Sequence, residues 1–518
     1  MEQGFRRSMG WLHTWAGVVL GSVLFAVFWM GTLSVFDNEI DRWMKPATRL
    51  APAPHGISLE TFRPSLDEAI AAKAAFWNII LPNDRQPVLQ LRYKTGKTFV
   101  SHEVDPASGH ILPDSGTLGG TEFIFPFHYT LQIELMDLGE WVVGLAAMAM
   151  LVLCVSGVII HRKIFAEFFT FRPYKKSRRI LLDLHNVCGV LGLPFHIFLT
   201  FSGLVILGAT YFPAGVTAVY SNPRAYFFDA NNLSFLAVKP DRSAAPVVSL
   251  DEAATRARAM WGGDEPQTVL VANPGKASSR LAFFRVNEGH VLMDRDVVAF
   301  SGATGALISR SPPLSPVIKA QRFLSGLHLI QFHHWVLRWV YFVLGMGSCV
   351  MIATGFLFWQ ESRRKTQGNM FGFRLVEGLT SGSVTGIILA TLAFFVSNRL
   401  LPANAHWLGQ GRAALEVWVF YTVWFATFVH GWVWPRTVWL AQSAAIAVFA
   451  GNAVLLNWVT TGDHPLRTLS HRYLWPVAGM DMVLLVGAGL ALLATMRLAR
   501  RAGGHSSAPR QAKGGSVG

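Results

Sequence analysis

Long apolar segments alternate with long polar ones along this chain of 518 residues. About eight segments are apolar over the roughly 20 residues that a helix needs to cross a bilayer. The pattern predicts a polytopic all-α membrane protein of about eight helices. Helices are expected at residues 1–36, 141–161, 181–212 and 326–360, with a four-helix region at 361–497. The first is too long for the apolar part of a signal peptide, so it is expected to be retained.

The two polar regions, 37–140 and 213–325, follow a similar order of elements. Each begins with a short amphipathic helical segment and continues with strands of alternating polarity. The first reads SLDEAIAAKAAF from Ser65 and the second reads SLDEAATRARAMW from Ser249. The shared order favours a duplication over a chance match of five letters. We therefore expect two related small α+β modules.

Charge refines this picture. The net charge of +14 comes largely from Lys and Arg beside apolar segments, including the basic stretches 162–180 and 498–518. Membrane topology explains this placement better than nucleic-acid binding does. The positive-inside bias puts the N-terminus and both basic stretches in the cytoplasm, and both polar regions outside. The three cysteines all lie in apolar segments, which offers neither a disulfide framework nor a CxxC metal site.

Histidines within the apolar segments are the candidate functional residues, because imidazoles inside a membrane are costly and usually functional. Haem b needs two facing neutral imidazoles. His13 and His185 each follow an arginine by six residues, so they are expected at one depth as a pair. His196 would lie on the same helix face as His185, roughly 16 Å further along. It is either a core histidine or a competing ligand. His161 is either an interfacial residue or a ligand.

Several segments resemble the PepSY-associated transmembrane family. They are WLHTWAGVVLG at Trp11, SGVIIHRKIF at Ser156, LDLHNVCGVLGLPFH at Leu182, and LHLIQFHH followed by GFLFW from Leu327. The two polar regions resemble the PepSY module. Together these matches cover about residues 1–364. The resemblance implies a siderophore-linked iron reductase of the bacterial inner membrane that binds two b-type haems. The four C-terminal helices lie outside it.

The resemblance also implies a second haem pair on the outer side, because His128 and His328 match histidine positions of the family. His334 is a further candidate ligand. It cannot serve one metal face together with His333, since adjacent helical residues point about 100° apart. Histidines of the polar regions, such as His55, are expected at the surface. The haems would be non-covalent, because no CxxCH is present.

The expected function is therefore transfer of electrons across the membrane to a ferric siderophore or other ferric chelate, with release of ferrous iron. Electrons would come from a quinol or a separate reductase, since the chain has no GxGxxG after a strand, no P-loop and no HExxH. No catalytic side chain is assigned. Two alternatives remain open: a non-enzymatic PepSY scaffold, sensor or peptidase regulator, and a small-molecule transporter that uses the C-terminal helices.

Overall fold

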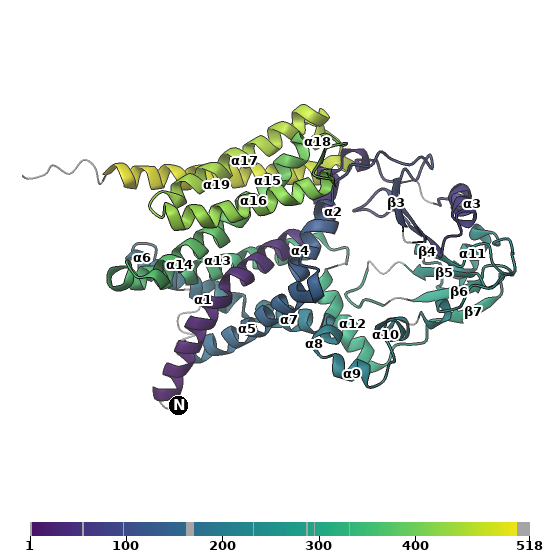
Figure 1. The fold of residues 1–518 in the computed structure, drawn as a ribbon, viewed down its shortest axis with the longest axis horizontal. Helices are drawn as coiled ribbons and strands as arrows, with labels where there is room; N and C mark the ends of the chain where they lie inside the picture. Colours follow the sequence, from purple (N-terminus) through teal and green to yellow (C-terminus); the bar gives the residue numbers. More distant parts are fainter. Residues whose placement is uncertain are drawn as a thin grey trace, which may run out of the picture.

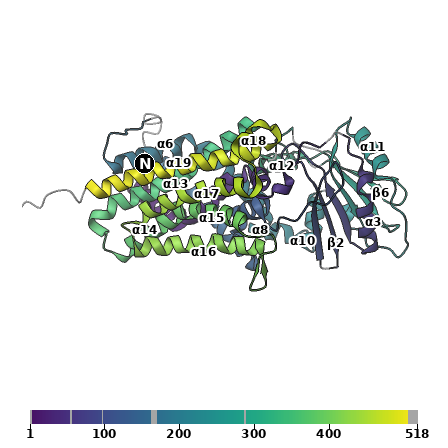
Figure 2. The same cartoon turned by 90° about the horizontal axis from the view of Figure 1, so that it is seen from above.

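The computed structural model describes residues 3–53, 56–96, 98–161, 170–231, 233–285, 289–294, 296–330 and 332–504. Within them the molecule is an elongated helical bundle with an antiparallel sheet beyond one end, here called the sheet end (Figures 1 and 2). The predicted surface residue His55, residues 162–169 of the predicted basic loop and the tail from residue 505 lie outside the described residues.

Seven helical segments are long and apolar enough to cross a membrane, and a bent helix pair would add an eighth. This confirms the predicted multi-pass helical class. The seven are α1 (Gln3–Ser34), α5 (Leu138–Ile160), α13 (Trp335–Gln367), α14 with α15 (Phe371–Ser381, Ile387–Leu400), α16 (Arg412–Val433), α17 (Val438–Thr461) and α19 (Trp475–Gly504). A π-helical turn, η6 (Gly382–Gly386), joins α14 to α15.

The bent pair is α6 (Ser177–Leu191) and α7 (Leu193–Ile206), whose axes differ by 62°. The prediction of one straight helix that places His185 and His196 on one face is therefore wrong. The break has a local cause: Gly192 joins the two helices, and Pro194 in the first turn of α7 has no N–H to continue the hydrogen bonds of α6.

The predicted start of the fourth helix near His328 is also wrong. His328 lies on a separate helix, α12 (Pro316–Leu329), which ends where Ile330 adopts a left-handed conformation with φ of 52°. The spanning helix α13 begins at Trp335. His334 caps it, since its ring Nδ1 accepts a hydrogen bond from the Leu337 N–H at 3.2 Å.

Both polar regions contribute to one seven-stranded sheet of order β3-β2-β1-β4-β5-β6-β7. The strands are β1 (Phe76–Ile80), β2 (Leu89–Thr95), β3 (Thr98–Val104), β4 (Pro266–Ala272), β5 (Arg280–Arg285), β6 (Val297–Ser301) and β7 (Leu307–Arg310). The halves join at the antiparallel pair β1–β4, where Trp77 stands opposite Val271 and Ile79 opposite Val269. All four side chains are buried in the core beneath α3 (Arg63–Ala71) and α11 (Leu250–Met260).

The two halves are related, but not through the matching SLDEA strings. Ser58, rather than Ser65, occupies the place of Ser249: each caps the first turn of the helical segment that follows. The carboxylates two residues further on make reciprocal contacts between the two helical segments. Glu60 accepts from the Leu250 N–H at 2.6 Å, and Asp251 accepts from the Leu59 N–H at 2.7 Å. The alignment on Ser65 is therefore wrong by seven residues. That each half is a PepSY module stays a prediction.

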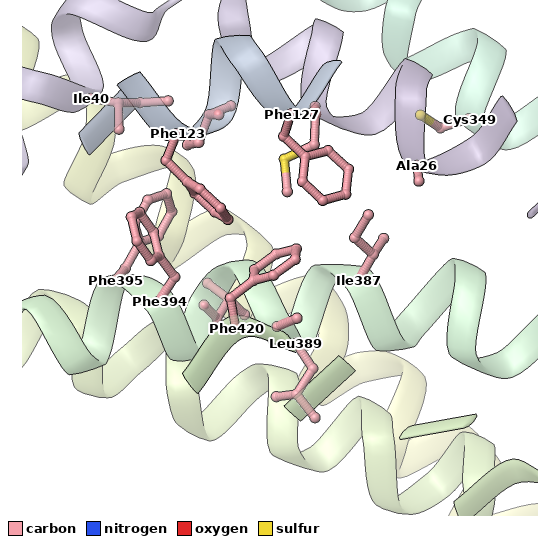
Figure 3. Packing of buried hydrophobic residues seen from close by; sticks show 14 of the residues in the cluster. Ala26, Ile40, Phe123, Phe127, Cys349, Ile387, Leu389, Phe394, Phe395 and Phe420 are labelled. Carbon is pink, nitrogen blue, oxygen red and sulfur yellow. The ribbon is translucent and has the colours of Figure 1, made fainter. Parts of the chain in front are cut away.

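The C-terminal helices pack along the bundle, and at its sheet end they contact the segment that contains α4 (Phe125–Thr130). Phe394 of α15 and Phe420 of α16 lie 4.7 and 5.1 Å from Phe123, centroid to centroid. Phe127 of α4 packs on Phe420 (Figure 3), and their ring centroids lie 5.6 Å apart. The C-terminal region thus supports the short helix that carries His128.

Candidate functional site

The imidazoles of His13 on α1 and His185 on α6 meet in the bundle at the end away from the sheet. Their ring centroids lie 6.2 Å apart, with an angle of 87° between the ring planes. The structure thus brings together His13 and His185, the two residues that were predicted to lie at the same membrane depth from their spacing to Arg7 and Arg179.

A second pair meets at the sheet end, where α4 and α12 approach each other (Figure 1). The ring centroids of His128 and His328 lie 5.9 Å apart, and the ring planes are tilted by 36°. Neither residue lies on a long spanning helix, so the separate helix α12 and the short helix α4 are what set this pair in place.

A buried carboxylate anchors the segment that leads into α4. Asp41 of α2 (Asp37–Met44) accepts from the Gly120 N–H at 2.6 Å and from the Thr121 hydroxyl at 2.5 Å. These contacts fix the π-helical turn η3 (Gly120–Ile124), which continues directly into α4. Burial raises the pKa of Asp41 to about 6, although nearby Lys45 favours its charged form. His128 is therefore held through a rigid connection to α2.

All four paired imidazoles have the same hydrogen-bond arrangement. In each, Nδ1 lies within hydrogen-bond distance of a backbone carbonyl, which can only accept, so Nδ1 carries the proton and Nε2 keeps its lone pair. No described residue hydrogen-bonds any of the four Nε2 atoms. The partners are the carbonyls of Leu153 for His13 (3.1 Å), Met351 for His185 (2.8 Å), Val27 for His128 (2.8 Å) and Leu199 for His328 (2.8 Å).

A glycine follows each of these carbonyls by four residues. A helical side chain covers the turn N-terminal to its own Cα. A glycine at this position therefore leaves the carbonyl accessible to a donor from a neighbouring helix, here the imidazole Nδ1–H. Each imidazole also packs directly on its glycine. A Cβ would meet the ring at 3.4 Å on Gly157 (His13), 3.2 Å on Gly355 (His185), 2.6 Å on Gly31 (His128) and 2.8 Å on Gly203 (His328).

The two pairs fit an axial bis-imidazole site. Metal–nitrogen bonds of about 2 Å on both sides of one ion, plus roughly 1.1 Å from each nitrogen to its ring centre, separate the centroids by about 6 Å. The observed separations are 6.2 and 5.9 Å. The angle between the ring planes is unrestricted by this geometry, because the rings share only the bond axis. A free Nε2 lone pair on each ring is what iron in haem b requires.

A cavity of about 600 Å³ surrounds the His13–His185 pair. This volume lies within the range typical of cofactor pockets. Its walls are mostly apolar side chains and glycines of α1, α5, α6 and α13, and Arg6, Arg179 and Arg363 line it as well. An apolar slot with cations matches a flat macrocycle with carboxylate substituents, so the residues present fit haem b.

The remaining candidate histidines are placed differently. His196 is buried and lines the same cavity, with Nε2 2.8 Å from the Ser348 hydroxyl and its ring against Phe28. His161 also lines the cavity, and its Nε2 is buried without a hydrogen-bond partner. His334 is the exposed cap of α13 and belongs to neither pair. Haem ligation by each of the predicted residues stays a prediction.

The four glycines beside the imidazoles were missed by sequence reasoning. Three of them share a sequence signal, because each follows a residue with a small hydroxyl side chain: Ser156–Gly157, Ser202–Gly203 and Thr354–Gly355. The fourth, Gly31, follows Met30. The hydroxyls of Ser156 and Ser202 lie 3.0 and 3.1 Å from the Nδ1 atoms of His13 and His328. Such dipeptides within apolar helices could have indicated where a histidine of a neighbouring helix packs.

Comparison with known proteins agrees with this architecture. The family model for the PepSY-associated TM region matches residues 10–361, which include both histidine pairs and the whole sheet. An uncharacterised protein of Pseudomonas aeruginosa is 24% identical over 362 residues, which cover 63% of this chain and 85% of that protein. The family match ends within α13, so the helices after α13 lie outside it. With more than half of its length matched, the chain belongs to the family of PepSY-associated transmembrane regions.

Proposed function

We propose that this protein is a haem-containing reductase of the bacterial inner membrane. It passes electrons across the membrane to a periplasmic ferric siderophore or other ferric chelate, and ferrous iron is released. The observation that carries the proposal is the presence of two imidazole pairs, one toward each end of the bundle, each with Nδ1 fixed by a carbonyl and Nε2 free.

The protein's own residues would do three things. His13 with His185, and His128 with His328, would hold the haem iron through their Nε2 atoms. The arginines that line the cavity, Arg6, Arg179 and Arg363, would pair with the carboxylates of a bound haem. The apolar walls exclude water. Haem, when bound, supplies one-electron transfer. A quinol or separate reductase gives one electron for each ferric ion, which leaves as ferrous iron.

Release of iron follows from the reduction, because ferrous iron carries less charge and binds hard oxygen ligands more weakly than ferric iron does. A hydrophilic chelate cannot enter hydrocarbon without a large desolvation cost, so a periplasmic chelate would be reduced where the bundle meets the periplasm. Our proposed orientation puts the sheet on that side, and we assign the delivery of electrons to the His128–His328 pair next to the sheet.

The first test is the haem content of the purified protein. Pyridine haemochrome analysis should give about two b-type haems per chain, one for each pair of axial imidazoles. The reduced protein should show a Soret band and α-bands of two sites in different surroundings. A colourless protein that takes up no haem would contradict the proposal and favour the scaffold or transporter alternatives.

The second test is topology. Reporter fusions at Gly96, after β2, and at Gly275, after β4, should both report the periplasm, because the two strands belong to one sheet. A fusion at Lys175, before α6, should report the cytoplasm. Opposite signals from Gly96 and Gly275 would overturn both the proposed orientation and the single sheet.

A further inference from the structure

A second cavity, of about 480 Å³, lies at the sheet end of the C-terminal helices and is separate from both histidine pairs. It is formed where the end of α15, the start of α16, the end of α17 and the short helix α18 (Pro465–Ser470) meet the segment after α2. Residues 113–115, which precede η3, close another side. The matched family region ends before most of these elements.

The lining of this cavity is cationic. Four arginines line it, Arg49, Arg399, Arg412 and Arg467, against two carboxylates, Asp114 and Asp463, so the formal balance is 4 − 2 = +2. Asp463 accepts from both Arg49 at 2.6 Å and Arg467 at 3.3 Å. Behind this wall, the buried carboxylate of Glu416 pairs with Arg412 at 3.0 Å, so part of the positive charge is compensated within the protein.

Two of the four arginines serve the fold. Arg49 is buried and bonds with all three of its nitrogens to Asp463, Asn457 and the carbonyls of Arg42 and Trp43. Arg412 pairs with the buried carboxylate of Glu416 at 3.0 Å and donates to the carbonyls of Ser115 and Asn398. These cations neutralise helix C-terminal carbonyls and buried acids, which accounts for their position without any ligand.

Arg399 and Arg467 are less fully paired than these two. Among the described residues, Arg399 has no ion pair. It lies 4.5 Å from the Trp43 ring centroid and donates to the Trp43 carbonyl, while its Nε is buried without a partner. Arg467 shares Asp463 with Arg49 through Nε alone, and its side chain is 50% exposed. A guanidinium has five N–H donors, so both retain several for a ligand in the cavity.

We propose that this cavity binds a small oxyanion, a carboxylate or phosphate group, between the guanidinium groups of Arg399 and Arg467. Planar guanidinium forks match pairs of carboxylate or phosphate oxygens, and the cavity is water-accessible yet walled by low-dielectric helices. An anion would also give Arg399 the ion pair that the described residues do not supply. The proposal does not rest on the proposed reductase activity.

The test is binding by the purified full-length protein in a chloride buffer of low ionic strength. Citrate and inorganic phosphate are titrated separately by calorimetry, and the wild type should bind at least one of them saturably. Arg399→Gln and Arg467→Gln should each weaken that binding by about tenfold, since each removes charge-assisted hydrogen bonds. Arg467 is half exposed, so its variant should fold even where the Arg399 variant does not. Arg472→Gln is the matched control, because Arg472 is exposed nearby and does not line the cavity.

Lipid extracted from the same preparations identifies the source of the group. An acidic phospholipid that copurifies with the wild type and is lost in Arg467→Gln would support a bound phosphate group that belongs to a lipid headgroup. Citrate or phosphate binding that both arginine variants retain at wild-type affinity would overturn the proposal. So would a wild type with neither saturable anion binding nor arginine-dependent lipid. Haem content is irrelevant to each readout, so failure here is distinguishable from failure of the reductase proposal.

Discussion

His128→Ala and His328→Ala should each lower the haem content from about two to about one per chain. Either change removes one of the two imidazoles at the sheet end, whose ring centroids are 5.9 Å apart, and one axial bond does not replace two. The His13–His185 pair lies at the other end of the bundle and should retain its haem. Protein reduced beforehand and then mixed with a ferric chelate should reoxidise far more slowly in both variants than in the wild type.

Two controls make this result specific. His334→Ala removes a histidine at the same end that caps α13 and should leave two haems and a wild-type rate of reoxidation. His185→Ala should remove the other haem and leave the sheet-end spectrum intact. Equal reoxidation rates in wild type, His128→Ala and His328→Ala would refute the assignment of electron delivery to this pair, even in a protein that binds haem.

Replacement of the four docking glycines by alanine should give a graded series of effects. The added Cβ would lie 2.6 Å from the His128 ring on Gly31 and 2.8 Å from the His328 ring on Gly203, closer than real contacts allow. On Gly157 it would lie 3.4 Å from the His13 ring, which a small shift accommodates. We expect Gly31→Ala and Gly203→Ala to displace an imidazole and lose most of the sheet-end haem, with overpacking that costs about 1–3 kcal/mol.

In the same series Gly157→Ala should retain its haem, and Gly355→Ala should be intermediate because its Cβ would lie 3.2 Å from the His185 ring. The measurement is haem content together with the α-band of each site. Gly347→Ala on α13 is the matched control: no atom lies within 4 Å of its added Cβ, so it should bind two haems and unfold no more easily than the wild type. A haem loss that does not follow these distances would contradict the docking role of the glycines.

The spans and the His13–His185 pair could be predicted from local signals, whereas the His128–His328 pair was expected only from the resemblance to the family. Apolar length defines α1, α5 and α13, and the spacing from Arg7 and Arg179 placed His13 and His185 together. The break at Gly192 could not be seen this way, since an apolar run through a bend has the same composition as a straight helix. The proline in the first turn of α7 was the available signal.

The repeat shows why a string match misleads. The five letters at Ser65 and Ser249 are identical, but the side chains that fix the alignment are Glu60 and Asp251, whose contacts join two helical segments far apart in the chain. Long-range contacts of this kind have no local signature. The glycines that receive the imidazoles are likewise recognised only once the neighbouring helix is known.

The β1–β4 pairing also decides whether the chain crosses the membrane an even or an odd number of times between these two strands. Residues 76–80 and 266–272 exchange main-chain hydrogen bonds in one sheet, so both strands lie in the same aqueous compartment. A chain that leaves a compartment and returns to it crosses the membrane an even number of times. Of the described helices between these strands, α5 supplies one crossing, and only the bent pair α6–α7 can supply the other. The bend at Gly192 is therefore a kink within a complete crossing rather than the turning point of a re-entrant loop.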